Sequence, residues 1–188
     1  MHTESEPGLA DRHPLIWTLG NLLAFQACWW TLILTGPRLA WLGLLVTGLW
    51  ALIHLSLTSQ ARADLLLMGV LFVAGPWLDV AVAAQGWLEY HGAAPYRGAP
   101  PYWIFGLWLA FAMTVHHAMR GIFQRPLLAA LLGAIGGPLA YYGGSRFGAA
   151  TLPDPATTAL LGLGLSWAAA MLLISLLSRQ LVKEKNSI

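Results

Sequence analysis

The chain has few charged residues and almost no cysteine. Only 10% of its 188 residues are Asp, Glu, Lys or Arg, whereas soluble domains carry about 25%. These charges give a net +2 and are scattered singly between apolar runs, which excludes the clustered basic face of a nucleic-acid-binding protein. Its single cysteine, Cys28, excludes an internal disulfide and a cysteine-based zinc site.

Motifs of several enzyme classes are also missing. The sequence has no HExxH pair, no GxSxG nucleophile elbow and no metal-ligand cluster of the usual spacing. The glycine-rich segment 143–148 lacks the lysine and the preceding strand of a phosphate-binding loop. We therefore expect no bound metal and no cofactor.

What the chain has is apolar sequence. Apolar residues make up 57% of it, ten residues are Trp, and the mean hydropathy is +0.63. Six apolar runs are each close to the roughly 20 residues that cross a bilayer, at residues 15–35, 39–58, 65–84, 102–119, 126–145 and 156–178. We predict an all-α bundle of about six transmembrane helices in one domain, 15–178, between a polar tail, 1–14, and a basic cytoplasmic tail, 179–188.

The positions of Lys and Arg between the runs predict the orientation. With a cytoplasmic N-terminus, three cations fall outside, Arg38, Arg97 and Arg146. Seven fall inside, namely Arg12, Arg62, Arg120, Arg125, Arg179, Lys183 and Lys185. Because cytoplasmic loops carry the excess of positive charge, we expect both termini in the cytoplasm.

One polar layer is expected toward the outer side. Asp79 lies near the outer end of the third run, and Tyr141, Tyr142 and Arg146 end the fifth. The loop after Asp79 adds Glu89, Tyr90, His91, Tyr96 and Arg97. Asp79 could pair with Arg146 or accept a hydrogen bond from a tyrosine hydroxyl. A carboxyl group away from water favours its protonated form and could act as a general acid; the alternative is a structural ion pair, or a boundary carboxylate that reaches water.

A second polar layer is expected toward the inner side. Its members are Asn21, His54, Asp64, His116, His117 and Arg120. His54 with one of the adjacent histidines could ligate a b-type haem or form a proton relay; alternatively the histidines bond to helix ends. His116 and His117 should not both face one ligand, because neighbours on a helix lie about 100° apart.

Small residues follow one face of the fifth run. Gly133, Gly137, Tyr141 and Gly144 are spaced i, i+4, i+8 and i+11, which is typical of close helix packing in membranes. The face could pack within the chain or bind a membrane protein partner. Pro138 should kink this helix.

Several residues occur in an order typical of one family. They are Asn21, Phe25, Gln26, Trp29, His54, Leu55, Arg62, Asp64, Asp79, Pro101, Trp103, Leu107, Trp108, Phe111, Ala112, Gly133, Ala134, Gly137, Pro138, Tyr141 and Gly144. Over residues 19–148 the chain resembles an uncharacterised bacterial inner-membrane family, domain-of-unknown-function family 2878, in which Glu is more usual at position 64. The resemblance implies a multi-pass protein of the bacterial inner (cytoplasmic) membrane with no established activity. Its genes often lie beside genes of fatty-acid modification, which implies a role connected with lipids.

A weaker likeness is to membrane-embedded carotenoid cyclases and hydratases. These proteins have an acidic residue late in one helix, a loop with Trp and Tyr, and a proline that begins the next helix. The corresponding residues here are Asp79, Trp87 and Tyr90 of segment 87–90, and Pro101. The cyclases have acidic residues just after that proline, where this chain has Tyr102 and Trp103.

The sequence thus favours a protein that binds or modifies an apolar lipid, fatty-acyl or isoprenoid, within the bilayer. If it is an enzyme, we expect Asp79 as the acid or base, oriented by Tyr141 and Arg146. The residues expected to contact the lipid are Asn21, Gln26, His54, Trp103, Trp108 and Tyr142. Two alternatives stay open: an accessory subunit or small transporter, and a haem protein. No nucleic acid is expected as a partner.

Overall fold

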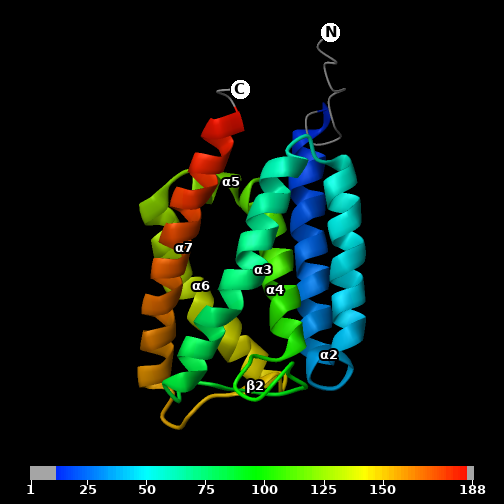
Figure 1. The fold of residues 1–188 in the computed structure, drawn as a ribbon. Coiled ribbons are helices and arrows are strands. Elements are labelled where there is room, and N and C mark those ends of the chain that lie inside the picture. Colours follow the sequence, from blue (N-terminus) through cyan, green and yellow to red (C-terminus); the bar gives the residue numbers. More distant parts are fainter. Residues whose placement is uncertain (1–11, 186–188) are drawn as a thin grey trace.

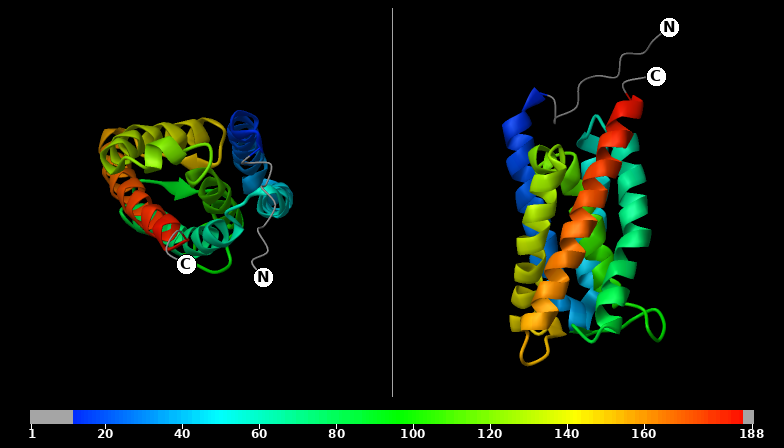
Figure 2. Two further views of the ribbon diagram at one scale, coloured as in Figure 1. Left: turned by 90° about the horizontal axis from the view of Figure 1, so that it is seen from above. Right: turned by 90° about the vertical axis from the view of Figure 1, so that its left-hand side faces the viewer.

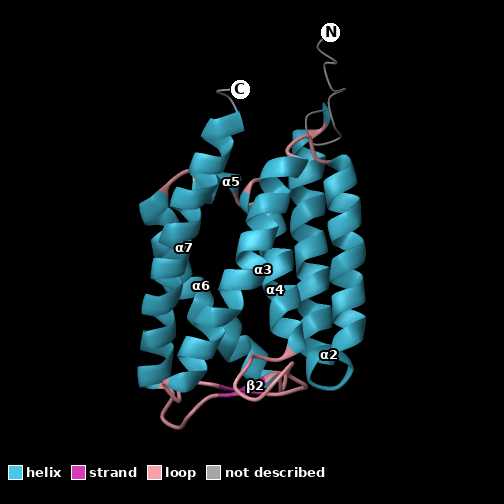
Figure 3. Ribbon diagram, in the orientation of Figure 1, coloured by secondary structure: helices cyan, strands magenta, loops and turns pink. Residues whose placement is uncertain are grey.

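The computed structural model describes residues 12–185, which form a bundle of helices (Figures 1 and 3). The helices are α2 (Pro14–Leu57), α3 (Ala61–Ala84), α4 (Tyr102–Val115), α5 (Arg120–Phe123), α6 (Pro126–Arg146) and α7 (Thr157–Lys185). Two strands of two residues each, β1 (Glu89–Tyr90) and β2 (Ala150–Thr151), join two loops. The prediction of an all-helical fold is confirmed. The predicted tail residues 1–11 and 186–188 lie outside the described residues.

The longest helix, α2, folds back on itself. Leu39 has non-helical backbone angles, φ −134° and ψ 51°, two residues after Pro37. Proline has no N–H for the helical hydrogen bond, so the helix is weakest here. Its two arms lie side by side in opposite directions (Figure 1). The sequence-based gap between the first two apolar runs coincides with this turn.

Within residues 12–185, four helices are long and apolar enough to cross a membrane: α2, α3, α6 and α7. The fourth predicted run forms a shorter helix, because α4 ends at Val115 and not at residue 119. The last run forms a longer one, since α7 continues to Lys185. Large apolar side chains cover the outside of the bundle, as at Leu127 and Leu165, which are 83% and 76% exposed. A surface of this kind is suited to lipid and not to water.

The helices divide into two groups with α3 between them. The two arms of α2 pack mainly on α4, whereas α6 packs mainly on α7. Helix α3 contacts both α4 and α7 and so connects the groups (Figure 2). Most of α4 is buried, including Trp103, Ile104 and Met113, so this short helix lies at the centre of the molecule.

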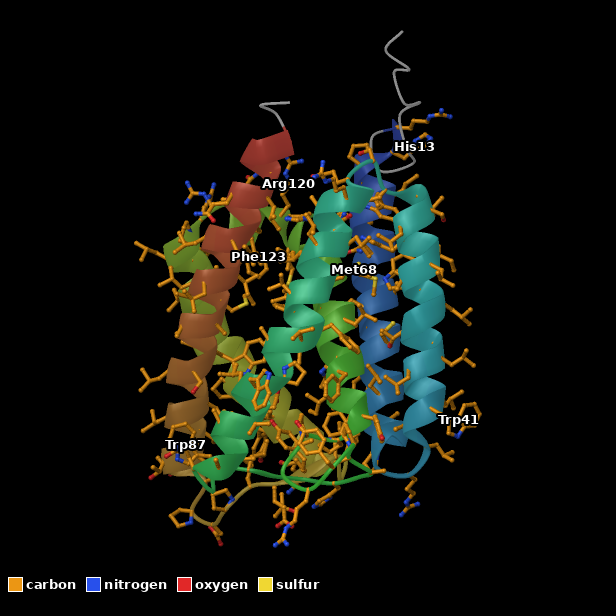
Figure 4. The ribbon with its side chains drawn as sticks, in the orientation of Figure 1. His13, Trp41, Met68, Trp87, Arg120 and Phe123 are labelled. Atoms are coloured by element: carbon orange, nitrogen blue, oxygen red, sulfur yellow. The ribbon has the colours of Figure 1, made fainter. Side chains whose placement is uncertain are left out.

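The bundle has two distinct ends. The start of α2 and the end of α7 lie at one, here called the terminal end (Figure 1). The turn of α2 and both strands lie at the other, here called the strand end. In the side-chain view His13 and Arg120 are at the terminal end, and Trp41 and Trp87 are at the strand end (Figure 4).

The strands at the strand end fix the loop that follows α3. Glu89 pairs with Thr151 and Tyr90 with Ala150 in an antiparallel register. The next residue, His91, donates its backbone N–H to the carbonyl of Ala149 at 3.0 Å. The loop is therefore held against the chain just beyond α6, and Tyr90 is directed toward the interior.

The small-residue face of α6 packs within the chain. A Cβ atom on Gly137 would lie 2.4 Å from Cγ of Trp167, and one on Gly133 would lie 2.6 Å from Cγ of Met171. Both contacts are with α7, so the glycines allow two helices to approach closely. A membrane protein partner bound through this face would have to displace α7.

Candidate functional site

The carboxylate of Asp79 accepts hydrogen bonds from three aromatic side chains. Its Oδ1 accepts from the hydroxyl of Tyr90 and, at 2.6 Å, from the hydroxyl of Tyr141. Its Oδ2 accepts from the indole N–H of Trp108 at 2.6 Å. These partners come from β1, α6 and α4, and Asp79 itself is only 2% exposed. No ion pair of Asp79 occurs within residues 12–185, so phenols and an indole are its hydrogen-bond partners.

Close packing holds Trp108 in this position. A Cβ atom on Gly75 would lie 2.1 Å from Cδ2 of Trp108, so a glycine is required one turn before Asp79 on α3. On its other face Trp108 stacks on Trp167, with ring centroids 5.1 Å apart and an interplanar angle of 3°. The indole N–H is therefore directed at the carboxylate by its neighbours on both sides.

Tyr90 is a hydrogen-bond donor throughout the ordinary pH range. Burial, together with the nearby Asp79 carboxylate, raises the pKa of its hydroxyl well above the usual value of about 10. Its backbone is fixed by the strand pair with β2. The carboxylate is thus bonded by a neutral hydroxyl that stays protonated.

A cavity of about 580 Å³ begins at Asp79 and extends between the helices. Its walls come from α2, α3, α4, α6 and α7, and they are mostly apolar. Five of the ten tryptophans line it, namely Trp29, Trp30, Trp103, Trp108 and Trp167. Asp79 is the only ionisable group in this wall apart from the tyrosines. Ligand sites in proteins are commonly apolar cavities of this size with few polar groups.

A second cavity, of about 570 Å³, lies on the loop side of the same carboxylate. It is bounded by the end of α3 and by the loops at the strand end, including Glu89, Gly98 and Thr151. Asp79 and Tyr90 line both cavities. This pair therefore stands between an apolar space inside the bundle and a more polar space among the loops.

Of the residues expected around Asp79, the structure brings Tyr141 to it and leaves Arg146 apart. Arg146 is exposed at the end of α6, and no hydrogen bond or ion pair joins it to Asp79. Of the two partners considered for Asp79, a tyrosine hydroxyl is therefore the one found. Tyr142 is 50% exposed and does not line the cavity.

Apart from Tyr142, the residues expected to contact a lipid separate into two groups. Trp103, Trp108 and Gln26 line the large cavity. Asn21 and His54 are fully buried but lie outside it, toward the terminal end. Sequence reasoning did not assign Tyr90 and Trp167 to the site. Tyr90 lies in the polar loop that follows the helix of Asp79, which was a usable signal, whereas Trp167 lies in an apolar run with no polar signal.

A second buried carboxylate, Asp64, lies near the terminal end. It accepts from His117 Nε2 and His116 Nδ1, each at 2.8 Å, from Thr58 Oγ1 at 3.0 Å and from His54 Nε2 at 3.2 Å. We call these five residues the Asp64 cluster. The prediction that Asp64 and these histidines share one polar layer is thus confirmed, but Arg120 is exposed.

The expectation that His116 and His117 cannot serve one partner is wrong. It assumed that both residues are helical, whereas α4 ends at Val115 and both lie in the turn that follows. The two rings therefore bond to different oxygens of the same carboxylate.

Neighbouring groups fix the proton positions of two histidines. The indole of Trp17 donates to Nδ1 of His117 at 2.8 Å. An indole N–H can only donate, so this Nδ1 has no proton and Nε2 carries the proton that bonds Asp64. The amide nitrogen of Asn21 faces Nδ1 of His54 at 3.5 Å and favours the same tautomer there. Asp64 thus accepts from four groups.

The Asp64 cluster resembles a metal site in composition but not in hydrogen bonding. Ligand atoms of His54, Asp64 and His117 lie within 4.8 Å of one another. A metal on Nε2 of His117 would require a proton on Nδ1, and that position accepts from Trp17. The rings of His54 and His117 are also in edge contact, with centroids 4.8 Å apart, which leaves no space for a haem between them.

Comparison with known proteins gives one match. The sequence profile of a family described as "Protein of unknown function (DUF2878)" matches residues 18–173. The chain belongs to this family. No curated protein and no solved structure matches it. Membership in DUF2878 confirms the resemblance found in the sequence, but it assigns no activity, so the site must be interpreted from its geometry.

Proposed function

We propose that the protein binds an apolar lipid within the bilayer and that Asp79 exchanges a proton with that lipid. The observation that carries this proposal is the cavity of about 580 Å³ that begins at Asp79. Its aromatic and aliphatic wall favours a fatty-acyl or isoprenoid chain over a polar solute. A buried carboxyl group at the end of such a cavity is a candidate for function, because ionisable groups inside membranes are costly.

The hydrogen bonds of Asp79 suit proton exchange. A carboxylate offers about four lone-pair positions, and Tyr90, Tyr141 and Trp108 use three of them. The unused position belongs to Oδ2, the oxygen that only Trp108 contacts. A proton bound there makes Asp79 a general acid, and its loss makes Asp79 a general base. The loop-side cavity supports exchange of this proton with water.

Comparative lipid mass spectrometry tests the proposal. A deletion strain would be complemented with the wild type, with Asp79→Asn, or with Asp154→Asn, which changes an exposed loop carboxylate in the same way. We expect a lipid species that requires the wild type, is lost with Asp79→Asn and is retained with Asp154→Asn. Equal amounts of the variants in the membrane must be verified.

The same experiment can refute the proposal. Identical lipid profiles in the deletion strain and in all complemented strains would contradict a lipid-modifying role. The accessory-subunit function would then be the better explanation, and a protein that co-purifies in detergent would support it.

We further propose that the chain crosses the bacterial inner membrane six times with both termini in the cytoplasm. The two arms of α2, together with α3, α4, α6 and α7, would be the spans. The excess of Arg and Lys in the loops of the terminal end supports this orientation.

Cysteine labelling tests the orientation. Cys28 is buried, so a membrane-impermeant maleimide should label only introduced cysteines. We expect labelling of Ala94→Cys in intact cells and of Gln124→Cys only after lysis; the reverse would refute the orientation.

A further inference from the structure

The large cavity reaches the lipid-facing surface between α2 and α6. Near the strand end, the ring of Trp30 in α2 lies 5.1 Å from that of Phe147, the residue that follows α6. Farther along, α2 packs on α4 and α6 packs on α7. In this region the cavity wall includes exposed residues, namely Gln26, Leu132 at 38% exposure and Gly136. The cavity therefore has a side opening between the two helices.

The rim of this opening carries one side-chain amide group that has no hydrogen-bond partner among the described residues. Gln26 lines the cavity, is exposed, and makes no hydrogen bond with any residue in the described range 12–185. It lies twelve residues after Pro14 in the first arm of α2, or about 18 Å at about 1.5 Å per residue. This is close to the middle of the arm, where an unpaired amide in hydrocarbon is costly. A partner from the ligand would remove that cost.

The charge of the wall limits the ligand. No Lys, Arg or His among the described residues lines the cavity, and Asp79 contributes a carboxyl group. A phosphate or carboxylate head group would therefore lack a counter-ion. The wall is compatible with a lipid that has no charge.

We propose that the ligand is a neutral lipid with a hydroxyl or carbonyl group, which enters sideways from the bilayer between α2 and α6 and bonds to Gln26. This inference rests on the proposed function, because it identifies the class of lipid that occupies the same cavity. The side opening gives a membrane-dissolved molecule direct access without passage through water. The carboxamide of Gln26 can donate to a carbonyl oxygen or accept from a hydroxyl, so it recognises either group.

Tryptophan fluorescence gives a direct binding assay, since half of the tryptophans line the cavity. The probes are long-chain compounds with bromine on the chain, because bromine quenches nearby indoles: an alcohol, its parent hydrocarbon, and the matching acid at a pH where it is ionised. We expect saturable quenching by the alcohol and only the non-saturable quenching of surface tryptophans by the acid. Equal saturable binding of the acid would overturn the proposal.

Two glycine variants test the route of entry. A Cβ atom on Gly136 or on Gly69 would meet nothing within 4 Å, so a larger side chain fits at both positions. Gly136 is on the rim, whereas Gly69 is exposed on α3 and does not line the cavity. We expect Gly136→Phe to weaken binding of the alcohol at least tenfold and Gly69→Phe to leave it unchanged. Equal effects of the two variants would overturn side entry.

Replacement of Gln26 tests recognition of the polar group. One hydrogen bond corresponds to roughly a fivefold change in affinity. We expect Gln26→Leu to weaken binding of the alcohol by about this factor and to leave binding of the hydrocarbon unchanged. An equal loss for both probes would overturn the role of Gln26.

The outcomes for this proposal and for the proposed function can be distinguished. If the alcohol binds but the lipid profile does not change, only the chemistry of Asp79 is refuted. If the lipid profile changes but the alcohol does not bind, only this ligand class is refuted.

Discussion

Helix α3 carries two buried carboxylates that have opposite surroundings. Asp64 accepts four hydrogen bonds, three of them from histidines, and lines neither of the two cavities described. Asp79 accepts three, all from aromatic side chains, and borders both cavities. The two side chains are almost equally buried, at 0% and 2% exposure. Burial alone therefore does not distinguish them.

Access to the cavities and the source of the donors do distinguish them. Asp64 accepts three hydrogen bonds on Oδ2 and one on Oδ1, and these bonds join the second arm of α2, the start of α3 and the end of α4. Asp79 keeps one position of Oδ2 free beside an apolar space. We infer a structural role for Asp64 because it joins these segments away from both cavities, and this contrast strengthens the case for chemistry at Asp79.

The largest effect should come from replacing the carboxylates themselves. Asp64→Asn replaces one carboxylate oxygen by an amide N–H₂, so the groups that donate to that oxygen lose their acceptor and face another donor. We expect this change to lower the free energy of unfolding by about 3–5 kcal/mol. Asp79→Asn should cost about 1–3 kcal/mol, because one indole N–H is left without a partner. Thermal unfolding in detergent, followed by circular dichroism, compares them. Equal losses would contradict the division of roles.

A smaller effect is expected when Trp108, which donates to Asp79, is displaced by a larger neighbour. Gly75→Ala forces the ring of Trp108 away, and we expect a cost of about 1–3 kcal/mol for overpacking with loss of the lipid product. Gly69→Ala is the matched control on the same helix, since its Cβ has open space. It should be neutral or should stabilise by up to about 1 kcal/mol. The paired unfolding curves and lipid profiles would show whether the position of Trp108 matters.

Trp17→Phe should alter the Asp64 cluster without removing a member of it. The change deletes one hydrogen bond, at a cost of about 0.5–1.5 kcal/mol, and frees Nδ1 of His117 to bind a proton. Nitrogen NMR of labelled histidine should show the Nε2–H tautomer for His117 in the wild type and a mixture in the variant. An unchanged His117 signal would mean that Trp17 does not select the tautomer.

The smallest effect concerns alkaline pH. Because the pKa of Tyr90 is raised in the folded state, the unfolded chain releases this proton first as the pH rises. Tyr90 therefore contributes stability that is complete below about pH 10 and decreases above it. Tyr90→Phe should flatten the decrease in melting temperature above that pH. Tyr96→Phe, which alters a residue that is 63% exposed, should follow the wild type.

The sequence predicted the helices well because apolar length is a local property. The turn of α2 at Leu39 and the bounds of α3 and α6 agree with the predicted runs to within a few residues. The end of α4 was placed too late, since 116–119 were included in the predicted run but form a turn. Hydropathy does not register that His116 and His117 must leave the helix to reach Asp64.

The site was predicted in part, because side-chain pairing depends on how helices rotate against one another. The polar layers grouped Asp79 with Tyr141 and Asp64 with three histidines correctly. For Asp79 the sequence left two kinds of partner open, Arg146 or a tyrosine hydroxyl. The Arg146 side chain is exposed, and the hydroxyls of Tyr141 and Tyr90 donate to the carboxylate. The cavity itself lies between five helices, α2, α3, α4, α6 and α7, so it depends on how they pack and not on the sequence of any one of them.

The order of the partners along the chain has a consequence for biogenesis. All three donors to Asp79 are synthesised after α3, and so are two of the four donors to Asp64, His116 and His117. When α3 leaves the ribosome, neither carboxylate has its full set of partners, which disfavours release of α3 alone into the lipid. Helix α3 is therefore expected to wait beside the insertion machinery until α4 arrives, and the two helices should enter the lipid as a pair.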